Sequence, residues 1–198
     1  MIAIVDYGAG NLTSVKKAID HLGYACAITA DPAQVRRAAK VILPGVGHFA
    51  ATAALTHCGL QDAVMEGIER RIPFLGICVG MQWMFTGSGE SPATPGLSLF
   101  PGQCVRFPAI VKSPHVGWNQ IEISSSSRLF RGVPSSSFVY FTHSFRAPVT
   151  DTTVARCDYG GEFSAAIERD HLFGVQFHPE KSGDSGLAIL RNFCELTC

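Results

Sequence analysis

The strongest constraint on the fold is the alternation of short apolar runs with amphipathic segments in the first half of the chain. The runs that predict strands are residues 2–5, 25–29, 41–43 and 73–77, and the segments that predict helices are 12–22, 35–39, 49–56, 60–70 and 79–85. Such alternation is typical of βαβ units, in which helices cover a parallel sheet. The first half is therefore predicted to be α/β.

The second half is β-rich. After a loop-like GSGESPATPG segment, shorter candidate strands follow at 103–107, 118–123, 138–141, 154–157, 164–168 and 172–176, and the serine runs at 124–127 and 135–137 are typical of turns. A last amphipathic helix is predicted over 183–196, with Leu187, Leu190 and Phe193 on one face. With no repeat and no boundary in the pattern, residues 1–198 are predicted to form one three-layer domain with an antiparallel extension.

The composition excludes several classes of function. Lys and Arg together number 16, as do Asp and Glu, without a basic cluster, so neither nucleic acid nor a membrane surface is an expected partner. The N-terminal MIAIVDYGAGN has no basic n-region, and no apolar run is long enough to span a membrane. The 7 cysteines are scattered without a CxxC pair, so no metal site is expected. We expect a soluble, unprocessed, reduced cytoplasmic protein whose ligands are small molecules or another protein.

A nucleophile motif stands between a buried strand and a helix, in Gly76-Ile77-Cys78-Val79-Gly80. This GxCxG is the cysteine counterpart of the GxSxG elbow, in which small residues let a strand turn abruptly into a helix with the nucleophile strained and exposed. The backbone N–H of Val79 is then expected to face the oxygen that becomes negative during attack. An isolated apolar cysteine is more often a core residue, but the elbow spacing favours a nucleophile.

A proton carrier is supplied by Phe177-His178-Pro179-Glu180, which directly follows a strand. In an extended segment, residues two apart point the same way, so Glu180 can fix the tautomer of His178 while the other nitrogen exchanges the proton of Cys78. Alone, an HxE pair is weak and is often a solvated strand end. Together with the elbow it predicts a Cys78, His178, Glu180 triad.

The glycine-rich turn Leu43-Pro44-Gly45-Val46-Gly47 is predicted to complete the oxyanion hole. Its glycines let a backbone N–H, that of Val46 or Gly47, turn towards the oxyanion opposite Val79. An ordinary βα turn is the alternative, whereas phosphate binding is disfavoured because the P-loop lysine is missing.

Several of these motifs together resemble one family. The resemblance is to the class I (triad) glutamine amidotransferases, and it is carried by the motifs GICVGMQ, GVQFHPEKS and LPGVG. More narrowly, the chain resembles the glutaminase subunits of imidazole glycerol phosphate synthase in DYGAGN at 6–11, PHVGWN at 114–119 and YFTHS at 140–144. The resemblance spans nearly the whole chain. It implies a flavodoxin-like fold, hydrolysis of L-glutamine to glutamate and ammonia in histidine biosynthesis, and no cofactor.

The resemblance also implies residues for the substrate. Gln82 and Glu90 are expected to bind the glutamine, and His143, Ser144 and Phe145 to line the same pocket. An acidic group suits the ammonium of a zwitterionic amino acid, and N–H or hydroxyl donors suit its carboxylate. Taken singly, His143 would be a satisfied core histidine and Glu90 a solvated loop charge.

The family also implies a partner, a (β/α)8-barrel cyclase subunit in a heterodimer. Ammonia passes to it inside the protein, which keeps the ammonia from protonation in water, and the cyclase makes imidazole glycerol phosphate and AICAR. Asn11, Trp118 and Lys181, each beside a motif, are expected on the docking face, although each also suits an ordinary surface.

Two departures from the family pattern leave alternatives open. Val79 stands where leucine is commoner, and Arg146 follows His143-Ser144-Phe145 where an aromatic residue is usual. The acceptor of the ammonia could instead be that of a paralogue in surface-sugar amidation. A catalytically idle scaffold and a cysteine peptidase are further alternatives, but the first conflicts with an intact triad and the second does not predict PHVGWN or Glu90.

Overall fold

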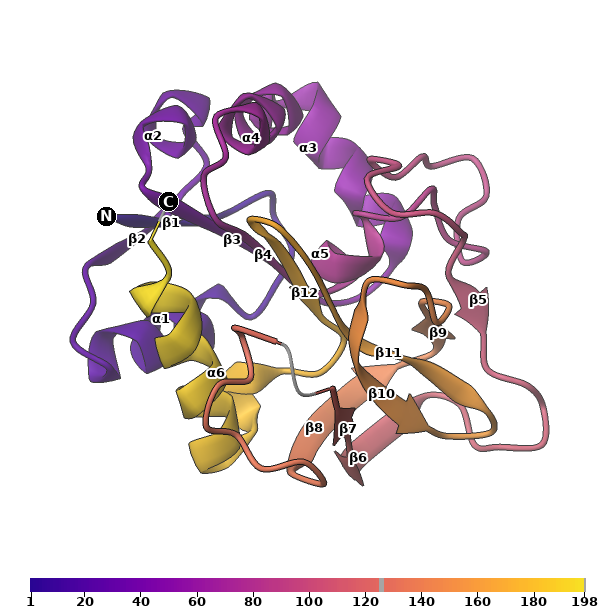
Figure 1. Cartoon of the computed structure of the whole chain (residues 1–198). Helices are drawn as coiled ribbons and strands as arrows, with labels where there is room; N and C mark the ends of the chain where they lie inside the picture. The colour runs from indigo at the N-terminus through magenta and orange to yellow at the C-terminus, as the bar shows by residue number, and fades with distance from the viewer. Residues whose placement is uncertain (125–126, 198) are drawn as a thin grey trace.

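A sheet of eight strands runs through the molecule in the computed structural model, which describes residues 1–124 and 127–197 (Figure 1). Its parallel half consists, in spatial order, of β2 (Cys26–Thr29), β1 (Ile2–Val5), β3 (Lys40–Gly45), β4 (Phe74–Cys78) and β12 (Leu172–Val175). The sheet continues with the antiparallel strands β11 (Glu162–Arg169), β10 (Thr153–Asp158) and β7 (Glu122–Ile123). The predicted mostly parallel sheet with an antiparallel extension is confirmed.

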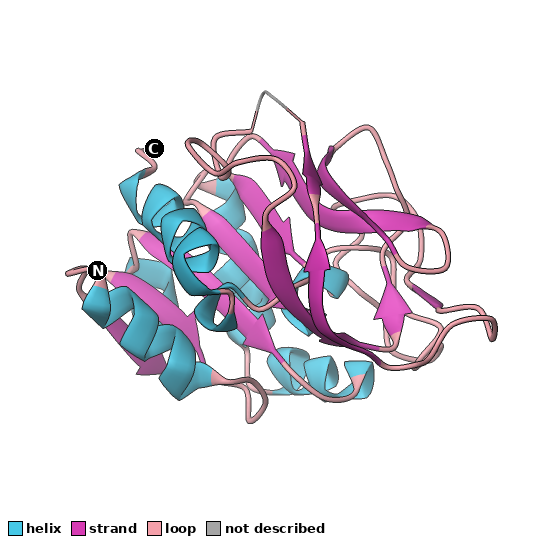
Figure 2. Ribbon diagram, turned by 90° about the horizontal axis from the view of Figure 1, so that it is seen from below, coloured by secondary structure: helices cyan, strands magenta, loops and turns pink. Residues whose placement is uncertain are grey.

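Helices cover both faces of the parallel half, which gives the three layers. On one face α1 (Leu12–His21) packs against α6 (Gly183–Glu195), and on the other α4 (Leu60–Glu69) packs against α2 (Pro32–Arg37) and α3 (Ala53–His57) (Figures 1 and 2). The buried stripe of α6 includes Ile189, Leu190 and Phe193, whereas Leu187, predicted on this face, is only half-buried. Burial of such stripes against the sheet is the main stabilising contribution of these helices.

Two small sheets accompany the antiparallel half. One pairs β5 (Val105–Arg106) with β9 (Phe145–Arg146), and the other pairs β6 (His115–Gln120) with β8 (Phe138–His143). In the second, Trp118 lies opposite Tyr140 and His115 lies opposite His143. Alternation along β6 directs Trp118 outwards and His115 into the protein, so this ribbon has one exposed and one buried face.

The predicted helix over 35–39 was misplaced. It begins at Pro32, because the Asp31 carboxylate accepts a hydrogen bond from the Ala33 N–H at 2.8 Å and proline is favoured in the first turn. The predicted helix over 49–56 is a 3₁₀ turn, η1 (Phe49–Thr52), followed by α3. Local capping explains the first shift.

The predicted helix over 79–85 was too long, since α5 ends at Gln82 (Val79–Gln82). Two carbonyls beyond it are used elsewhere: Trp83 O accepts from the Leu97 N–H at 2.7 Å and Phe85 O from the Ser98 N–H at 3.0 Å. The Met84 and Phe85 N–H groups bond three residues back, to Met81 O and Gln82 O at 3.0 and 3.2 Å, so α5 tightens into a turn, and the following loop takes the carbonyls needed to continue the helix beyond residue 85.

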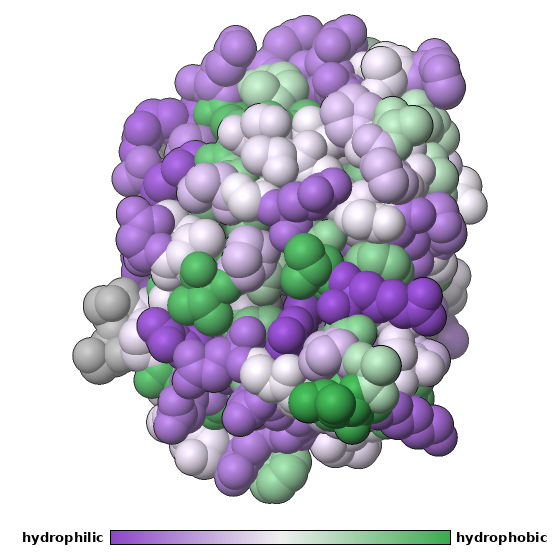
Figure 3. Space-filling model, turned by 90° about the vertical axis from the view of Figure 1, so that its right-hand side faces the viewer, coloured by the Kyte–Doolittle hydropathy of each residue, from purple (hydrophilic) through white to green (hydrophobic). Residues whose placement is uncertain are grey.

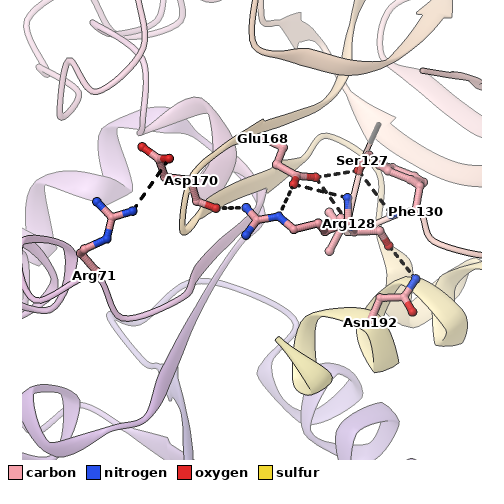
Figure 4. Close-up of polar contacts among 8 residues, drawn as sticks. Arg71, Ser127, Arg128, Phe130, Glu168, Asp170 and Asn192 are labelled. Carbon is pink, nitrogen blue, oxygen red and sulfur yellow. Dashed lines mark hydrogen bonds and ion pairs between the residues drawn. The ribbon is translucent and has the colours of Figure 1, made fainter. Parts of the chain in front are cut away.

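Two predicted strands differ in the structure. The strand predicted at 103–107 is only β5, and the one predicted at 118–123 is interrupted at the buried Ile121, which separates β6 from β7. The strand β9 and the 3₁₀ turn η2 (Pro179–Lys181) were not predicted. The serines at 135–137 include a turn, whereas residues 125–126 of the other serine run lie outside the described residues. The chain after them is anchored by Glu168 of β11, which accepts from Ser127 Oγ and Arg128 Nε at 2.7 and 2.8 Å (Figure 4).

The surface and the cysteines carry few special features. On the face beside β5 and β9, hydrophobic residues form small separate groups among polar ones (Figure 3). The cysteines at 26, 58, 78, 104, 157 and 194 are free thiols, and Cys198 lies outside the described residues. Within residues 1–124 and 127–197, no helix has the length and apolar character needed to cross a membrane.

Candidate active site

Cys78 occupies a strained elbow between β4 and α5. Its backbone has φ 54° and ψ −110°, in the region that residues with a Cβ rarely adopt, and the side chain is 2% exposed. The flanking glycines are required by close packing, because a Cβ on Gly80 would lie 2.0 Å from Leu43 O and one on Gly76 would lie 2.5 Å from Gly80 O. The strained elbow predicted from the GxCxG spacing is present, but the predicted exposure of the nucleophile is wrong, because Cys78 is buried in this structure.

His178 and Glu180 form a buried pair, with Nδ1 to Oε1 at 2.9 Å and both side chains 1% exposed. The segment was predicted to be extended, and this is wrong, because Pro179–Lys181 form the 3₁₀ turn η2. The pair still forms because the backbone N–H of His178 donates to Tyr140 O at 2.9 Å and Ser182 Oγ donates to His178 O at 2.6 Å. The turn is thereby tied to β8.

The charge state of His178 is set by its two neighbours. Burial alone lowers its pKa, but the adjacent Cys78 thiol and the Glu180 carboxylate outweigh burial and raise the pKa from 6.5 to about 10. Nδ1 is used by Glu180, whereas Nε2 has no hydrogen-bond partner among the described residues. Nε2 is therefore the nitrogen available to exchange a proton with Cys78.

A cavity of about 30 Å³ adjoins the thiol and brings together most of the predicted site. It is lined by Gly47, Cys78, Val79, Gln82, Glu90, Thr142, His143, Ser144 and Phe145. Val46 is half-buried beside it and is not among the lining residues. Gly47 has φ +88°, which a residue with a Cβ rarely adopts, so the predicted turn needs a glycine at this position.

Two of the residues expected to bind substrate already have partners in the protein. The amide nitrogen of Gln82 donates to Phe145 O at 2.8 Å and to Gln176 Oε1 at 3.1 Å. The carboxylate of Glu90 accepts from the Phe49 N–H at 2.8 Å, which ties the loop after the elbow to η1. Glu90 is therefore not the solvated loop charge that it would be in isolation.

His143 belongs to a second histidine cluster that was not predicted. Its Nδ1 donates to Phe145 O at 2.9 Å, and its Nε2 lies 3.3 Å from Nδ1 of His115. Burial lowers the pKa of His143 to about 3 and that of His115 to about 4. Both rings are neutral near pH 7. The pair was missed because the predicted strands 118–123 and 138–141 include neither histidine, whereas the observed strands β6 and β8 do.

Gln176 is a further residue that the motifs did not single out. Its side chain is fully buried and its amide nitrogen lies 3.6 Å from Cys78 Sγ. The available signal was a glutamine two residues before His178 inside the apolar run FGVQF, because a buried amide needs a polar partner.

The predicted docking residues lie near one another. Trp118 is 55% exposed and its ring meets Tyr140 edge-on at 6.1 Å, while the Lys181 ammonium lies 5.8 Å from the Tyr140 ring centre. Asn11 precedes α1, which packs against η2, the turn that carries Lys181. Trp118 and Lys181 thus lie against the same Tyr140 ring, whereas Asn11 is connected to them only through the packing of α1 against η2.

Comparisons with known proteins identify the family of this chain. Residues 3–196 match the model of the family "Glutamine amidotransferase class-I". The imidazole glycerol phosphate synthase subunit HisH of Moorella thermoacetica is 50% identical, covering 98% of this chain and 94% of that one. The HisH subunit of Methanothermobacter thermautotrophicus is 47% identical, covering 99% and 98%.

Solved structures share the fold at low identity. A glutamine amidotransferase crystal structure has a TM-score of 0.76 and 18% identity, covering 98% of this chain and 100% of that one. A chain in the structure of PurLQS from Thermotoga maritima has a TM-score of 0.71 and 18% identity, covering 98% and 96%. From the family match and the close relatives, this chain belongs to the class-I glutamine amidotransferase family, together with the HisH subunits of imidazole glycerol phosphate synthase.

Proposed function

We propose that this chain is the glutaminase subunit of an imidazole glycerol phosphate synthase, and that Cys78, His178 and Glu180 hydrolyse L-glutamine to glutamate and ammonia. The observation that carries the proposal is the buried His178–Glu180 pair beside a cysteine on a strained elbow. The sequence identity to two HisH subunits supports the choice of synthase among the amidotransferases.

The chemistry follows from the proton positions. His178 Nε2 holds the proton that Cys78 gives up, since the raised pKa of His178 favours the imidazolium, and the thiolate attacks the side-chain carbonyl carbon of glutamine to form a tetrahedral intermediate. His178 returns the proton to the amide nitrogen, which leaves as ammonia, and water then hydrolyses the thioester to glutamate. Glu180 holds the ring in the required orientation and stabilises the imidazolium.

The developing oxyanion needs donors from two segments. Val79 supplies one backbone N–H at the elbow, and Val46 or Gly47 supplies the second. We propose that the segment 45–47 holds its donor in an unproductive orientation until the partner and its ligand shift the population. Glutamine turnover that is equal with and without the liganded partner would rule this out.

The cavity beside Cys78 is narrow. At about 30 Å³ it is small for a glutamine side chain, so the lining segments are expected to move apart when the substrate binds. The Glu90 bond to Phe49 N–H spans two of these segments. Release of that bond would free the carboxylate for the substrate ammonium, and Gln82, His143, Ser144 and Phe145 complete the pocket in this proposal.

The partner is a (β/α)8-barrel cyclase subunit that receives the ammonia through the protein interior. Its docking face is the outer side of the β6/β8 ribbon, where Val116, Trp118 and Phe138 are exposed large apolar side chains, with Lys181 and Asn11 beside them. Aromatic and basic anchors of this kind dominate interface energies. Trp118→Ala is expected to weaken cyclase binding at least about tenfold in calorimetric titration, and an unchanged affinity would place the docking face elsewhere.

The proposed function is tested by mixing the chain with a cyclase subunit and its ribulosyl ligand and following glutamate release. Turnover that depends on the partner and is lost in Cys78→Ala is the expected result. If wild type stays inactive with that partner while a glutamine analogue labels Cys78, the partner assignment is wrong. If the analogue labels nothing, the triad assignment is wrong as well.

A further inference from the structure

Gln176 lies directly after β12 and contacts both Cys78 and the pocket residue Gln82. Its backbone N–H donates to Ala165 O at 2.8 Å, which holds the main chain against β11, and the side chain is inaccessible to solvent. Two polar contacts satisfy its amide: Oε1 lies 3.1 Å from Gln82 Nε2, and Nε2 lies 3.6 Å from Cys78 Sγ. No step of the triad chemistry uses this residue.

The direction of these bonds can be derived from one carbonyl. Phe145 O can only accept, so the Gln82 atom 2.8 Å from it must be the amide nitrogen. That nitrogen has a second hydrogen, which requires an acceptor, and the atom of Gln176 that meets it must be Oε1. The NH₂ group of Gln176 is therefore the end that meets the sulfur, because the reversed amide would oppose two donors and aim an oxygen at Cys78.

We infer that Gln176 is a further functional residue of this site, a hydrogen-bond donor that orients Cys78 Sγ and stabilises its thiolate. The inference rests on the proposed role of Cys78 as nucleophile. A buried thiolate is costly without partners, and a donor to the charged form favours it. His178 supplies the proton exchange, whereas the Gln176 amide donates to sulfur in a fixed direction without titrating.

Gln82 acts in this arrangement as a positioning residue, because both hydrogens of its amide nitrogen are used, on Phe145 O and on Gln176 Oε1. Only its oxygen remains for a ligand. The pocket wall at Phe145 is thereby connected to the nucleophile by two side-chain amides in series.

The test measures the ionisation of Cys78 directly in the full chain. The ¹³Cβ signal of Cys78 is followed by NMR against pH in wild type and in Gln176→Leu, with the signal assigned by its loss in Cys78→Ala. The expected result is an upward shift of the Cys78 titration midpoint by about one pH unit in Gln176→Leu. Such a shift makes the ratio of thiolate to thiol about tenfold smaller at a given pH. A midpoint equal to that of wild type in a folded Gln176→Leu would overturn the inference.

A matched control is Asn192→Leu, which removes another buried amide. Asn192 Nδ2 donates to Leu129 O and Arg131 O at 2.9 and 2.8 Å. It lies on α6 beside the segment that carries Arg128 and Phe130 (Figure 4). This variant is expected to lower the melting temperature and leave the Cys78 midpoint unchanged. A shift equal to that of Gln176→Leu would mean that general loosening, and not the donor, moves the midpoint.

A second variant serves if Gln176→Leu does not fold. Gln176→Glu keeps an acceptor for Gln82 but replaces the donor by an oxygen, so the Cys78 midpoint is expected to rise by more than about one pH unit above that of wild type. An unchanged midpoint contradicts the inference. The proposed function can fail independently of this inference. If the Cys78 midpoint shifts as expected but a glutamine analogue never labels Cys78, with or without the cyclase, the role of Gln176 stands and the glutaminase assignment is wrong.

Discussion

Two buried histidines, His143 at the end of β8 and His178 beside that strand, differ in charge near pH 7: His143 is neutral and His178 is protonated. His178 pairs with a carboxylate and lies beside a thiol, and its pKa is raised to about 10. His143 donates to a carbonyl and packs among aromatic rings, and burial lowers its pKa to about 3. Depth of burial does not distinguish them, because both side chains are almost inaccessible. The partners decide whether a buried imidazole carries a charge.

The neutral cluster shows how a histidine is held uncharged. Because Phe145 O accepts from His143 Nδ1, the Nε2 of His143 is the acceptor for His115 Nδ1, and Asn119 Nδ2 lies 3.4 Å from the remaining nitrogen of His115. The His115 ring stacks on Tyr159 at 4.0 Å between centroids. Each ring nitrogen thus has one partner in the neutral form, and a proton added to either ring would oppose a donor.

The largest expected effect separates the two sites by function. His178→Asn removes the proton carrier, so partner-dependent glutamate release is expected to fall by about 10³-fold or more. His115→Gln, a control in the neutral cluster, is expected to lower kcat less than about tenfold, because His115 does not contact the thiol and reaches the pocket only through His143. Equal losses in both variants would show that the clusters act as one unit.

Next in size is the conversion of the charged site towards the neutral one. Glu180→Gln keeps a hydrogen-bonding group beside His178 Nδ1 but removes the charge, and kcat is expected to fall by about 10²-fold or more. The pKa of His178, read from ring ¹⁵N shifts, is expected to fall from its raised value because the carboxylate contribution is lost. A His178 pKa that is unchanged would assign the raised value to Cys78 alone.

Acid is expected to unfold the protein through the neutral site. The folded pKa values of about 3 and about 4 for His143 and His115 lie below the ordinary 6.5, so the unfolded state binds protons that the folded state excludes. Their contribution to stability is complete above pH 6.5 and is lost as the pH falls from 6.5 towards 4. Urea unfolding across this range measures the slope, and His115→Gln is expected to make it shallower; an unaltered slope would exclude His115 as its source.

The smallest effect is expected in alkali and has the opposite sign. The pKa of His178 is raised in the folded state, so its contribution to stability is complete below pH 6.5 and declines as the pH rises through about 10. Urea unfolding between pH 7 and 10 is expected to show falling stability in wild type and a flatter profile in His178→Asn. A wild-type profile without decline would contradict the raised pKa.

Local patterns were sufficient for the fold class and for the elbow. The strand from 73 to 77 and the glycines around Cys78 lie within one short window, and the turn that they predict is governed by steric contacts of that window. His178 and Glu180 are two residues apart, so their pairing was also predictable, although the backbone between them is η2 and not extended. Errors fell where remote groups supply the partners, as in α5, which ends when Trp83 O bonds to Leu97.

The sequence by itself therefore determined the alternating α/β layers, the strained elbow at Cys78 and the His178–Glu180 pair, because propensity, periodicity and backbone sterics act between near neighbours. Only the tertiary structure decided that Gln176 meets Cys78, 98 positions away, and that His115 meets His143 through the β6/β8 register. Charge states belong to this second class. They depend on which donors, acceptors and rings from distant strands surround a buried group, and no short window contains that information.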